Sequence, residues 1–409
     1  MKKLTELTLG ILTAIGAFVD IGDIVGNAAT GARFQMALAW AVVLGTIGIM
    51  LYAEMAGRIA TLSKRGVFDL ARERLGPRLG MVNLVASFLV TFLTLAAEIG
   101  GMALILELLT NMNYIVWIPP CAFLVWFVVW RVRFQTMERM FGLMGLGLLV
   151  WIVALWQFGP DWGHLWHSAM HPAVPPTESH LSYWYWAVSL LGATITVYEP
   201  FFFSSGAVEE KWGRTDLIVN RGNVYLGFPL GALLSLALMA LSAIFLFPRG
   251  IQVDHLSQAA LPTTLVLGRV GLTVLLIGAF AAVCGAAIET SLSCGYIVSQ
   301  YFGWQWGKMV KPKEAARFHA VVLLSVAAAT VLILTTIDPI KLTELVIIMV
   351  AIAAPLTYFP ILVIANDPRY VGDKTNSRVS NSLAIGFMAI LVVASVAAIP
   401  LLIISKGGQ

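Results

Sequence analysis

The stretch at residues 17–31 reads AFVDIGDIVGNAATG and places two aspartates, Asp20 and Asp23, inside an apolar run. A carboxylate within a membrane-spanning segment is costly to bury and by default marks a pathway or a binding site. Two carboxylates three residues apart share one helix face, and they converge if the helix breaks at Gly22. Two adjacent anions at low dielectric favour a cation between them, and oxygen ligands suit a hard divalent cation. The alternative is that one aspartate is protonated or pairs with a basic residue such as Arg33.

The composition of the whole chain indicates that this stretch lies in a membrane. The 409 residues are 59% hydrophobic and 12% charged, which is about half the charged fraction of soluble globular proteins. This excludes a soluble enzyme and a disordered chain, and a formal net charge of +4 gives no basic surface for nucleic acid. The three cysteines lie in apolar runs without the spacing of a metal site or a disulfide framework. We therefore expect an all-α polytopic membrane protein with a single transmembrane domain.

Eleven apolar stretches have the length of membrane-spanning helices, which need roughly 20 residues each. They cover residues 5–31, 34–60, 80–109, 113–130, 141–158, 182–208, 220–248, 263–302, 317–337, 341–365 and 380–404. With a cytoplasmic N-terminus, 21 of the 26 lysines and arginines fall in inner segments, as the positive-inside rule requires. We therefore predict eleven transmembrane helices, a cytoplasmic N-terminus and residence in the cell (inner) membrane.

The sixth span carries a second interruption. Its residues 192–200 read GATITVYEP and place glycine, hydroxyls, a carboxylate and a proline inside a long apolar run. Because proline removes a backbone donor, we expect the helix to unwind near 195–200 and to free carbonyl groups. Broken helices at corresponding places in two halves of a transporter indicate a binding site at the midplane. Spans 1 and 6 correspond if residues 5–158 and 182–365 are inverted five-helix repeats, with 380–404 as an accessory helix.

These motifs resemble those of the NRAMP family of divalent-metal transporters, which have the LeuT-type fold. The family's first-span motif Asp-Pro-Gly-Asn is similar to DIGD at residues 20–23, at the matching distance before the Gly-Ala-aromatic stretch GARF at 31–34. Its sixth-span motif Gly-Ala-Thr-Val-Met-Pro-His-Asn is similar to GATITVYE at 192–199. Its third-span motif Asp-Leu-Ala-Glu-Val-Ile-Gly is similar to LAAEIGG at 95–101. The resemblance implies a LeuT-type fold for spans 1–10.

The departures from the family motifs resemble its magnesium-transporter branch, which lacks the methionine and is described as uncoupled from protons. Thr196 stands where the family has a methionine, whose thioether favours softer transition metals. Asp23 stands where the family has asparagine and adds negative charge. In the family, several side chains of the third and sixth spans are associated with proton movement. Of these side chains, this sequence retains only Glu98. These departures favour a hard ion and the absence of proton coupling.

The resemblance implies an ion site between spans 1 and 6. Its ligands would be the side chains of Asp20, Asp23 and Thr196 and the carbonyl groups of Ala17 and Ala193. Such an all-oxygen site would hold a partly hydrated Mg²⁺, since this ion is small, hard and reluctant to shed water.

Four further polar side chains are candidates for the ion pathway: Glu98, Tyr198, Glu199 and Glu289. Glu199 either raises the negative potential beside the unwound segment or pairs with a basic residue at the cytoplasmic end. For Glu98 we favour a structural hydrogen-bonding role. Glu289 either pairs with Arg221 or Arg317 or lines the permeation route. The outer loop at 158–181 contains four of the six histidines, but it is proline-rich and without helical periodicity, so we expect a solvated loop.

We predict a secondary transporter for divalent metal ions, chiefly Mg²⁺ and also Mn²⁺, that works by alternating access without proton coupling. An inside-negative potential favours entry of a divalent ion by about 4.6 kcal/mol per 100 mV. The alternatives are a proton-coupled Mn²⁺/Fe²⁺ symporter, a LeuT-type carrier of a small organic solute, and a membrane enzyme that uses Mg²⁺. We expect no enzymatic activity and no cofactor apart from the transported ion. The partners expected are this ion and the lipid bilayer, with no nucleic acid and no obligate protein partner.

Overall fold

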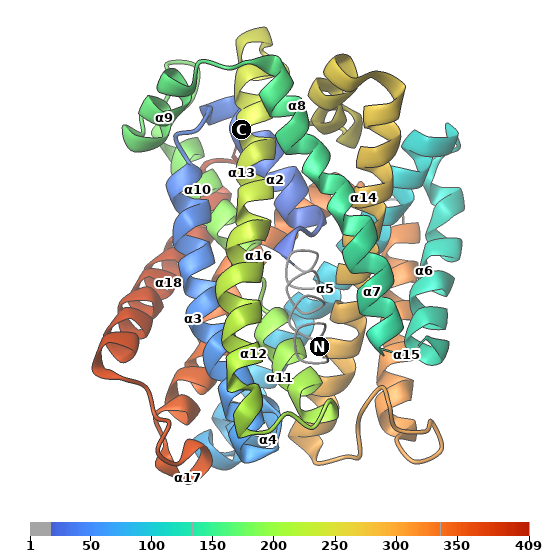
Figure 1. The fold of residues 1–409 in the computed structure, drawn as a ribbon, viewed down its shortest axis with the longest axis vertical. Helices are drawn as coiled ribbons and strands as arrows, with labels where there is room; N and C mark the ends of the chain where they lie inside the picture. The colour runs from blue at the N-terminus through green and yellow to red at the C-terminus, as the bar shows by residue number, and fades with distance from the viewer. Residues whose placement is uncertain (1–17, 133, 336, 409) are drawn as a thin grey trace.

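The computed structural model describes residues 18–132, 134–335 and 337–408, which form a bundle of helices (Figure 1). The first half contains α2 (Ile21–Phe34), α3 (Ala39–Ser63), α4 (Val67–Leu75), α5 (Pro77–Thr110), α6 (Tyr114–Arg131), α7 (Phe134–Gly145), α8 (Val150–Phe158) and α9 (Trp162–Met170). The second half contains α10 (His180–Thr194), α11 (Glu199–Glu209), α12 (Leu217–Gly222), α13 (Phe228–Phe245), α14 (Leu256–Phe302), α15 (Ala316–Leu334), α16 (Pro339–Ala365), α17 (Pro368–Val371) and α18 (Arg378–Ile404). No strand occurs in the described ranges.

Ten helical segments of the described chain are long and apolar enough to cross a membrane. They coincide with the second to eleventh predicted spans, and pairs of consecutive helices such as α10 and α11 form single spans. The predicted first span, 5–31, is described only from residue 18 onward, where it includes α2. The chain is therefore a multi-pass membrane protein.

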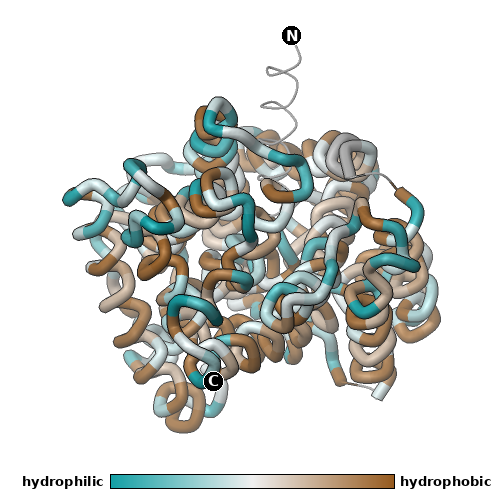
Figure 2. Tube along the Cα trace, turned by 90° about the horizontal axis from the view of Figure 1, so that it is seen from below, coloured by the Kyte–Doolittle hydropathy of each residue, from teal (hydrophilic) through white to brown (hydrophobic). Residues whose placement is uncertain are grey.

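The two ends of the bundle differ as the positive-inside rule predicts. The segments expected to be cytoplasmic, among them α4, α12 and α17, lie at one end of the molecule, and α9 and the C-terminus lie toward the other (Figure 1). Seen from the first of these ends, hydrophilic segments lie in the connections and hydrophobic ones along the helices (Figure 2). The alternation of inner and outer segments thus follows the order expected from the sequence.

The start of α2 lies deep in the bundle because α2 packs against α5, α10, α13 and α16. Two glycines permit this close packing. A Cβ atom at Gly31 would lie 2.3 Å from the carbonyl oxygen of Met239 in α13, and one at Gly192 would lie 2.1 Å from that of Ile347 in α16. Small residues of this kind let helix backbones approach one another closely in membranes.

The outer loop at 158–181 is largely exposed, as expected of a solvated loop, but part of it forms α9, which the absence of helical periodicity did not indicate. Asp161 caps this helix, since its Oδ1 accepts a hydrogen bond from the backbone N–H of His164 at 3.1 Å. Leu165 anchors the helix, with 8% of its side chain exposed. A side-chain cap and one buried apolar residue therefore suffice for a short helix that no periodicity indicated.

Candidate functional site

The first helix break lies at Asp20, which has an extended backbone (φ −98°, ψ −178°). Phe18 is helical, and α2 begins at Ile21. The helix therefore does not break at Gly22, the possibility considered from the sequence, and Gly22 belongs to the first turn of α2. The break lies at Asp20 because this residue caps the N-terminus of α2: its Oδ1 accepts a hydrogen bond from the backbone N–H of Asp23 at 2.7 Å.

The second break, expected near 195–200, is confirmed at residues 195–198, between α10 and α11. Pro200 occupies the first turn of α11, where its missing N–H leaves no hydrogen bond unmade. The last turn of α10, which includes Ala193, ends in carbonyl groups that the helix does not satisfy. One carbonyl of the unwound segment, that of Ile195, accepts a hydrogen bond from the hydroxyl of Tyr358 in α16.

Three predicted site residues, Asp20, Ala193 and Thr196, line one cavity between the two breaks. Glu98 and Tyr198, two of the predicted pathway residues, line it as well. The rest of its lining is largely apolar and comes mainly from α5 and α16. The cavity volume open to the centre of a water molecule is about 20 Å³, which corresponds to one bound water. The structure thus brings oxygen-bearing residues from both broken helices together around a small cavity.

Two hydroxyl groups that line this cavity lack hydrogen-bond partners. Thr196 Oγ1 and the Tyr198 hydroxyl are both unpaired, with 4% and 2% of the respective residues exposed. An unmade hydrogen bond in a buried position costs about 1–3 kcal/mol. A bound ion or water molecule is one explanation for a buried polar atom that has no hydrogen-bond partner in a native protein. A cation beside Asp20 would supply the missing partner for Thr196.

Asp23, in contrast, is absent from the lining of the cavity. Its side chain is fully buried, and both of its oxygens have protein donors. Oδ1 accepts a hydrogen bond from Asn27 Nδ2 at 2.8 Å, and Oδ2 accepts one from Ser235 Oγ at 2.5 Å. Arg33, the alternative partner considered for the aspartates, pairs with Glu178 at 2.8 Å instead. Ala17, the remaining predicted ligand, lies outside the described residues.

Glu98 of α5 contacts the first turn of α2. Both of its carboxylate oxygens lie near the backbone nitrogen of Ile21, at 3.3 and 3.4 Å, where they accept its N–H. A negative charge is favourable at a helix N-terminus, where the first N–H groups have no partner within the helix. The contact agrees with a structural role for Glu98, at a position that also borders the cavity.

Glu199 and Glu289 face each other from α11 and α14. Both are buried, with 3% and 4% exposed, and their side chains hydrogen-bond to each other. Among the described residues, Glu199 makes no ion pair with a cytoplasmic base. The two arginines considered for Glu289 make other contacts: Arg221 pairs with Glu54 at 3.6 Å, and the guanidinium of Arg317 lies over a tryptophan ring.

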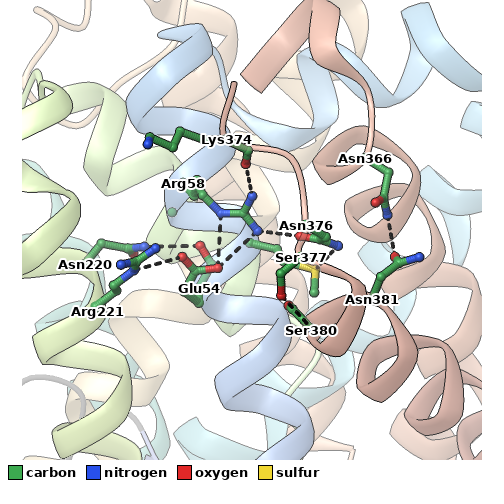
Figure 3. Close-up of polar contacts among 12 residues, drawn as sticks. Glu54, Arg58, Asn220, Arg221, Asn366, Lys374, Asn376, Ser377, Ser380 and Asn381 are labelled. Atoms are coloured by element: carbon green, nitrogen blue, oxygen red, sulfur yellow. Dashed lines mark hydrogen bonds and ion pairs between the residues drawn. The ribbon is translucent and has the colours of Figure 1, made fainter. Parts of the chain in front are cut away.

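A separate polar cluster at the Lys/Arg-rich end joins α3, α12 and the segment before α18 (Figure 3). Buried Glu54 accepts a hydrogen bond from Arg58 Nε at 3.2 Å. Arg58 also donates to the carbonyl of Lys374 and to Asn376 Oδ1. Asn220 Nδ2 donates to the backbone carbonyl of Glu54 at 3.1 Å. These hydrogen bonds indicate a structural role for the cluster, although the buried Oδ1 of Asn220 has no hydrogen-bond partner.

In the described part of the chain, no three His, Cys, Asp or Glu side chains are grouped so as to hold a metal ion. The candidate site therefore depends on the Asp20 carboxylate together with hydroxyl, carbonyl and water oxygens. Sequence reasoning missed Ser235 and Asn27 as partners of Asp23. The spacing of four residues between Asp23 and Asn27 on one helix could have indicated the second contact. No sequence signal indicates Ser235, which is 212 residues away from Asp23.

Known proteins share the fold of this chain. The family model for natural resistance-associated macrophage protein-like (Nramp) proteins matches residues 10–400. The manganese transporter of Eremococcus coleocola, in a histidine-to-alanine variant, has a TM-score of 0.76 and 17% identity, over 100% of this chain and 88% of that one. Mhp1, a nucleobase-cation-symport-1 family transporter with bromovinylhydantoin bound, has a TM-score of 0.60 and 15% identity, over 97% and 92% of the two chains. MhsT in complex with L-phenylalanine has a TM-score of 0.59 and 16% identity, over 96% and 98%. The LeuT-type fold expected from the motifs is therefore confirmed.

Proposed function

We propose that this chain, which belongs to the Nramp family because that family's model matches residues 10–400, carries divalent metal ions across the cell membrane by alternating access. Membership of this family and the similarity to a manganese transporter support divalent metal transport. The observation that carries the proposal is the cavity at the junction of two broken helices, where the Asp20 carboxylate and the unpaired Thr196 hydroxyl lie together. The chain is thus a transporter rather than an enzyme.

Mg²⁺ is the preferred cargo, and Mn²⁺ is also accepted. None of the described residues that line the cavity carries sulfur, so every ligand offered to the ion is an oxygen atom. Hard oxygen ligands suit Mg²⁺, and the loss of a thioether removes the bias toward softer metals. In this view Asp20 and Thr196 bind the ion directly, with the Ala193 carbonyl. Asp23, three residues along the chain and outside the cavity lining, adds negative charge without binding the ion.

Alternating access requires that the cavity open to one side at a time. Ile347 of α16 packs against both broken helices, since a Cβ atom at Gly22 would lie 2.9 Å from its Cγ2 and one at Gly192 would meet its carbonyl. The cavity has room for about one water molecule. We therefore infer that separation of α16 from α2 and α10 admits the ion with part of its water shell.

Proton coupling is not part of the proposed mechanism. Tyr198 takes the place of a histidine in the family's sixth-span motif. Glu98 accepts a hydrogen bond from the backbone N–H of Ile21 at the start of α2. The membrane potential supplies about 4.6 kcal/mol per 100 mV for a divalent ion, which is sufficient for uptake. The second candidate is a proton-coupled Mn²⁺ symporter, which the similarity to a manganese transporter favours. A carrier of organic solutes is disfavoured, because the cavity is far smaller than an amino acid.

The test combines binding and flux. Isothermal titration with Mg²⁺ and Mn²⁺ compares the wild type with Asp20→Ala, and Glu314→Ala, at an exposed carboxylate outside the spans, is the control. We expect Asp20→Ala to weaken Mg²⁺ binding by at least about tenfold, because it removes the charged ligand of the cavity. Unchanged binding and uptake in Asp20→Ala would refute the site. Proteoliposomes with an internal pH reporter decide the coupling: acidification that accompanies Mg²⁺ uptake would support the proton-coupled alternative.

A further inference from the structure

Three histidines lie on one face of α9, the short helix of the outer loop, and at its C-cap. His164, His167 and His171 follow one another at spacings of three and four residues, and all three are exposed. Residues at these spacings are neighbours on a helix surface. Their alignment depends on the formation of α9, which lies at the end of the molecule opposite α4 and α17 (Figure 1).

The rings of His167 and His171 lie side by side. Their centroids are 4.4 Å apart, and their planes differ by 19°. A tetrahedral ion with Zn–N bonds of about 2.0–2.1 Å holds two imidazole nitrogens about 3.3 Å apart. The two rings are therefore at a separation that one ion can bridge.

A hydrogen bond determines which ring nitrogen of His171 is available to an ion. Its Nδ1 lies 3.3 Å from the backbone carbonyl oxygen of His167. Because a carbonyl oxygen only accepts, Nδ1 carries the proton and Nε2 keeps its lone pair. Histidines that bind metals in proteins usually donate their other ring N–H in this way, since the bond orients the ring and makes the ligand more basic. His171 therefore has the tautomer and the support of a metal ligand.

We propose that His167 and His171 form a site for a borderline divalent transition-metal ion, such as Zn²⁺ or Cu²⁺, at the outer face of the protein. Neutral imidazole suits these ions, whereas Mg²⁺ prefers oxygen ligands. In the described part of the chain, no third His, Cys, Asp or Glu side chain joins the pair. Water molecules therefore complete the coordination of the ion.

This outer site goes beyond the proposed function, because neither histidine lines the cavity between the two broken helices. The described side chains that line the cavity offer oxygen ligands, and the outer pair offers nitrogen ligands. The two sites therefore select different ions, with hard ions in the cavity and borderline ions at the outer face.

The experiment measures metal binding by the full chain, purified without a histidine tag. Isothermal titration with Zn²⁺, with excess Mg²⁺ present to occupy the cavity, compares the wild type with His167→Ala, His171→Ala and the double variant. We expect the dissociation constant of the outer ion to rise by at least about tenfold in each single variant, because one of two imidazole ligands is lost. His164→Ala is the matched control, since it removes an exposed histidine from the same helix face, and it should bind Zn²⁺ as the wild type does.

The electron paramagnetic resonance spectrum of bound Cu²⁺ gives a second readout, since it reports the number of coordinated nitrogens. We expect two nitrogens in the wild type and in Asp20→Ala, and one in each single histidine variant. Zn²⁺ binding that is the same in the wild type and in the double variant would overturn the outer site, as would an equal loss in His164→Ala. Failure of the wild type to bind Mg²⁺, with the outer ion retained, would overturn the proposed function alone.

Discussion

The hydroxyl of Ser235 in α13 donates a hydrogen bond of 2.5 Å to the carboxylate of Asp23 in α2. Both side chains are fully buried. Asn27 provides a second donor to the same carboxylate at 2.8 Å. Asp23 is therefore held by the protein itself, whereas Asp20, three residues earlier, borders the cavity. The two aspartates that look equivalent in the sequence have different environments.

Replacement of Ser235 by alanine is expected to destabilise the protein by about 1–3 kcal/mol, because it leaves a buried carboxylate oxygen without its donor. Thermal unfolding in detergent measures the effect. Ser242→Ala is the matched control, since Ser242 lies in the same helix, is fully buried and has no partner for its hydroxyl. Equal losses of stability in the two variants would show that the bond to Asp23 contributes nothing.

Replacement of Thr196 by valine keeps the size of the side chain and removes the unpaired hydroxyl. We expect unchanged or slightly higher stability, since no hydrogen bond is lost, together with Mg²⁺ binding weakened by about tenfold. Thr196→Met introduces a thioether, so inhibition of Mg²⁺ uptake by Cd²⁺ should become stronger. Mg²⁺ uptake into proteoliposomes, with Cd²⁺ as competitor, measures this inhibition. A ratio of Mg²⁺ to Cd²⁺ affinity that is the same in Thr196→Met as in the wild type would argue against Thr196 as a ligand.

The outer ion pair between Arg33 and Glu178 is expected to stabilise the fold. It is bidentate, with distances of 2.8 and 2.9 Å, and only 13% and 10% of the two side chains are exposed. A double-mutant cycle with Arg33→Ala and Glu178→Ala should give a coupling energy of about 1–3 kcal/mol. The pair Arg65–Glu73, with 45% and 51% exposed, is the comparison and should couple by less than about 1 kcal/mol. A weaker coupling for the outer pair would contradict the prediction.

Lys308, in the connection between α14 and α15, should make stability depend on alkaline pH. Burial lowers the pKa of its ammonium group to about 8 from 10.5. The unfolded chain therefore binds more protons than the folded one between these two values, so stability rises as the pH increases from about 8 to 10.5. Thermal unfolding across this range should show a smaller rise in Lys308→Met. The exposed Lys313→Met variant is the control, and an identical slope in both variants would disprove the assignment.

The two helix breaks and the residues that border the cavity followed from local properties of the chain. Charged and helix-breaking groups are costly in an apolar span, so Asp20 and the stretch at 192–200 indicated the site before any contact was known. Glycine and proline also place the second break within a few residues, since they act on the backbone nearby. The first break lies at Asp20 rather than at Gly22, because the Asp20 side chain caps the start of α2 by accepting the backbone N–H of Asp23.

Local patterns thus account for the ten crossings found in the described residues and for the two broken helices that meet at the site, since each depends on the cost of placing one segment in a bilayer. They do not account for the separate environments of Asp20 and Asp23 or for the contact between Glu199 and Glu289. These depend on the angle and depth at which helices distant in sequence pack, as α2 does against α13 and α11 against α14. Such packing arises from close contacts like that of Gly192 with the carbonyl of Ile347, which a linear pattern of hydropathy does not contain.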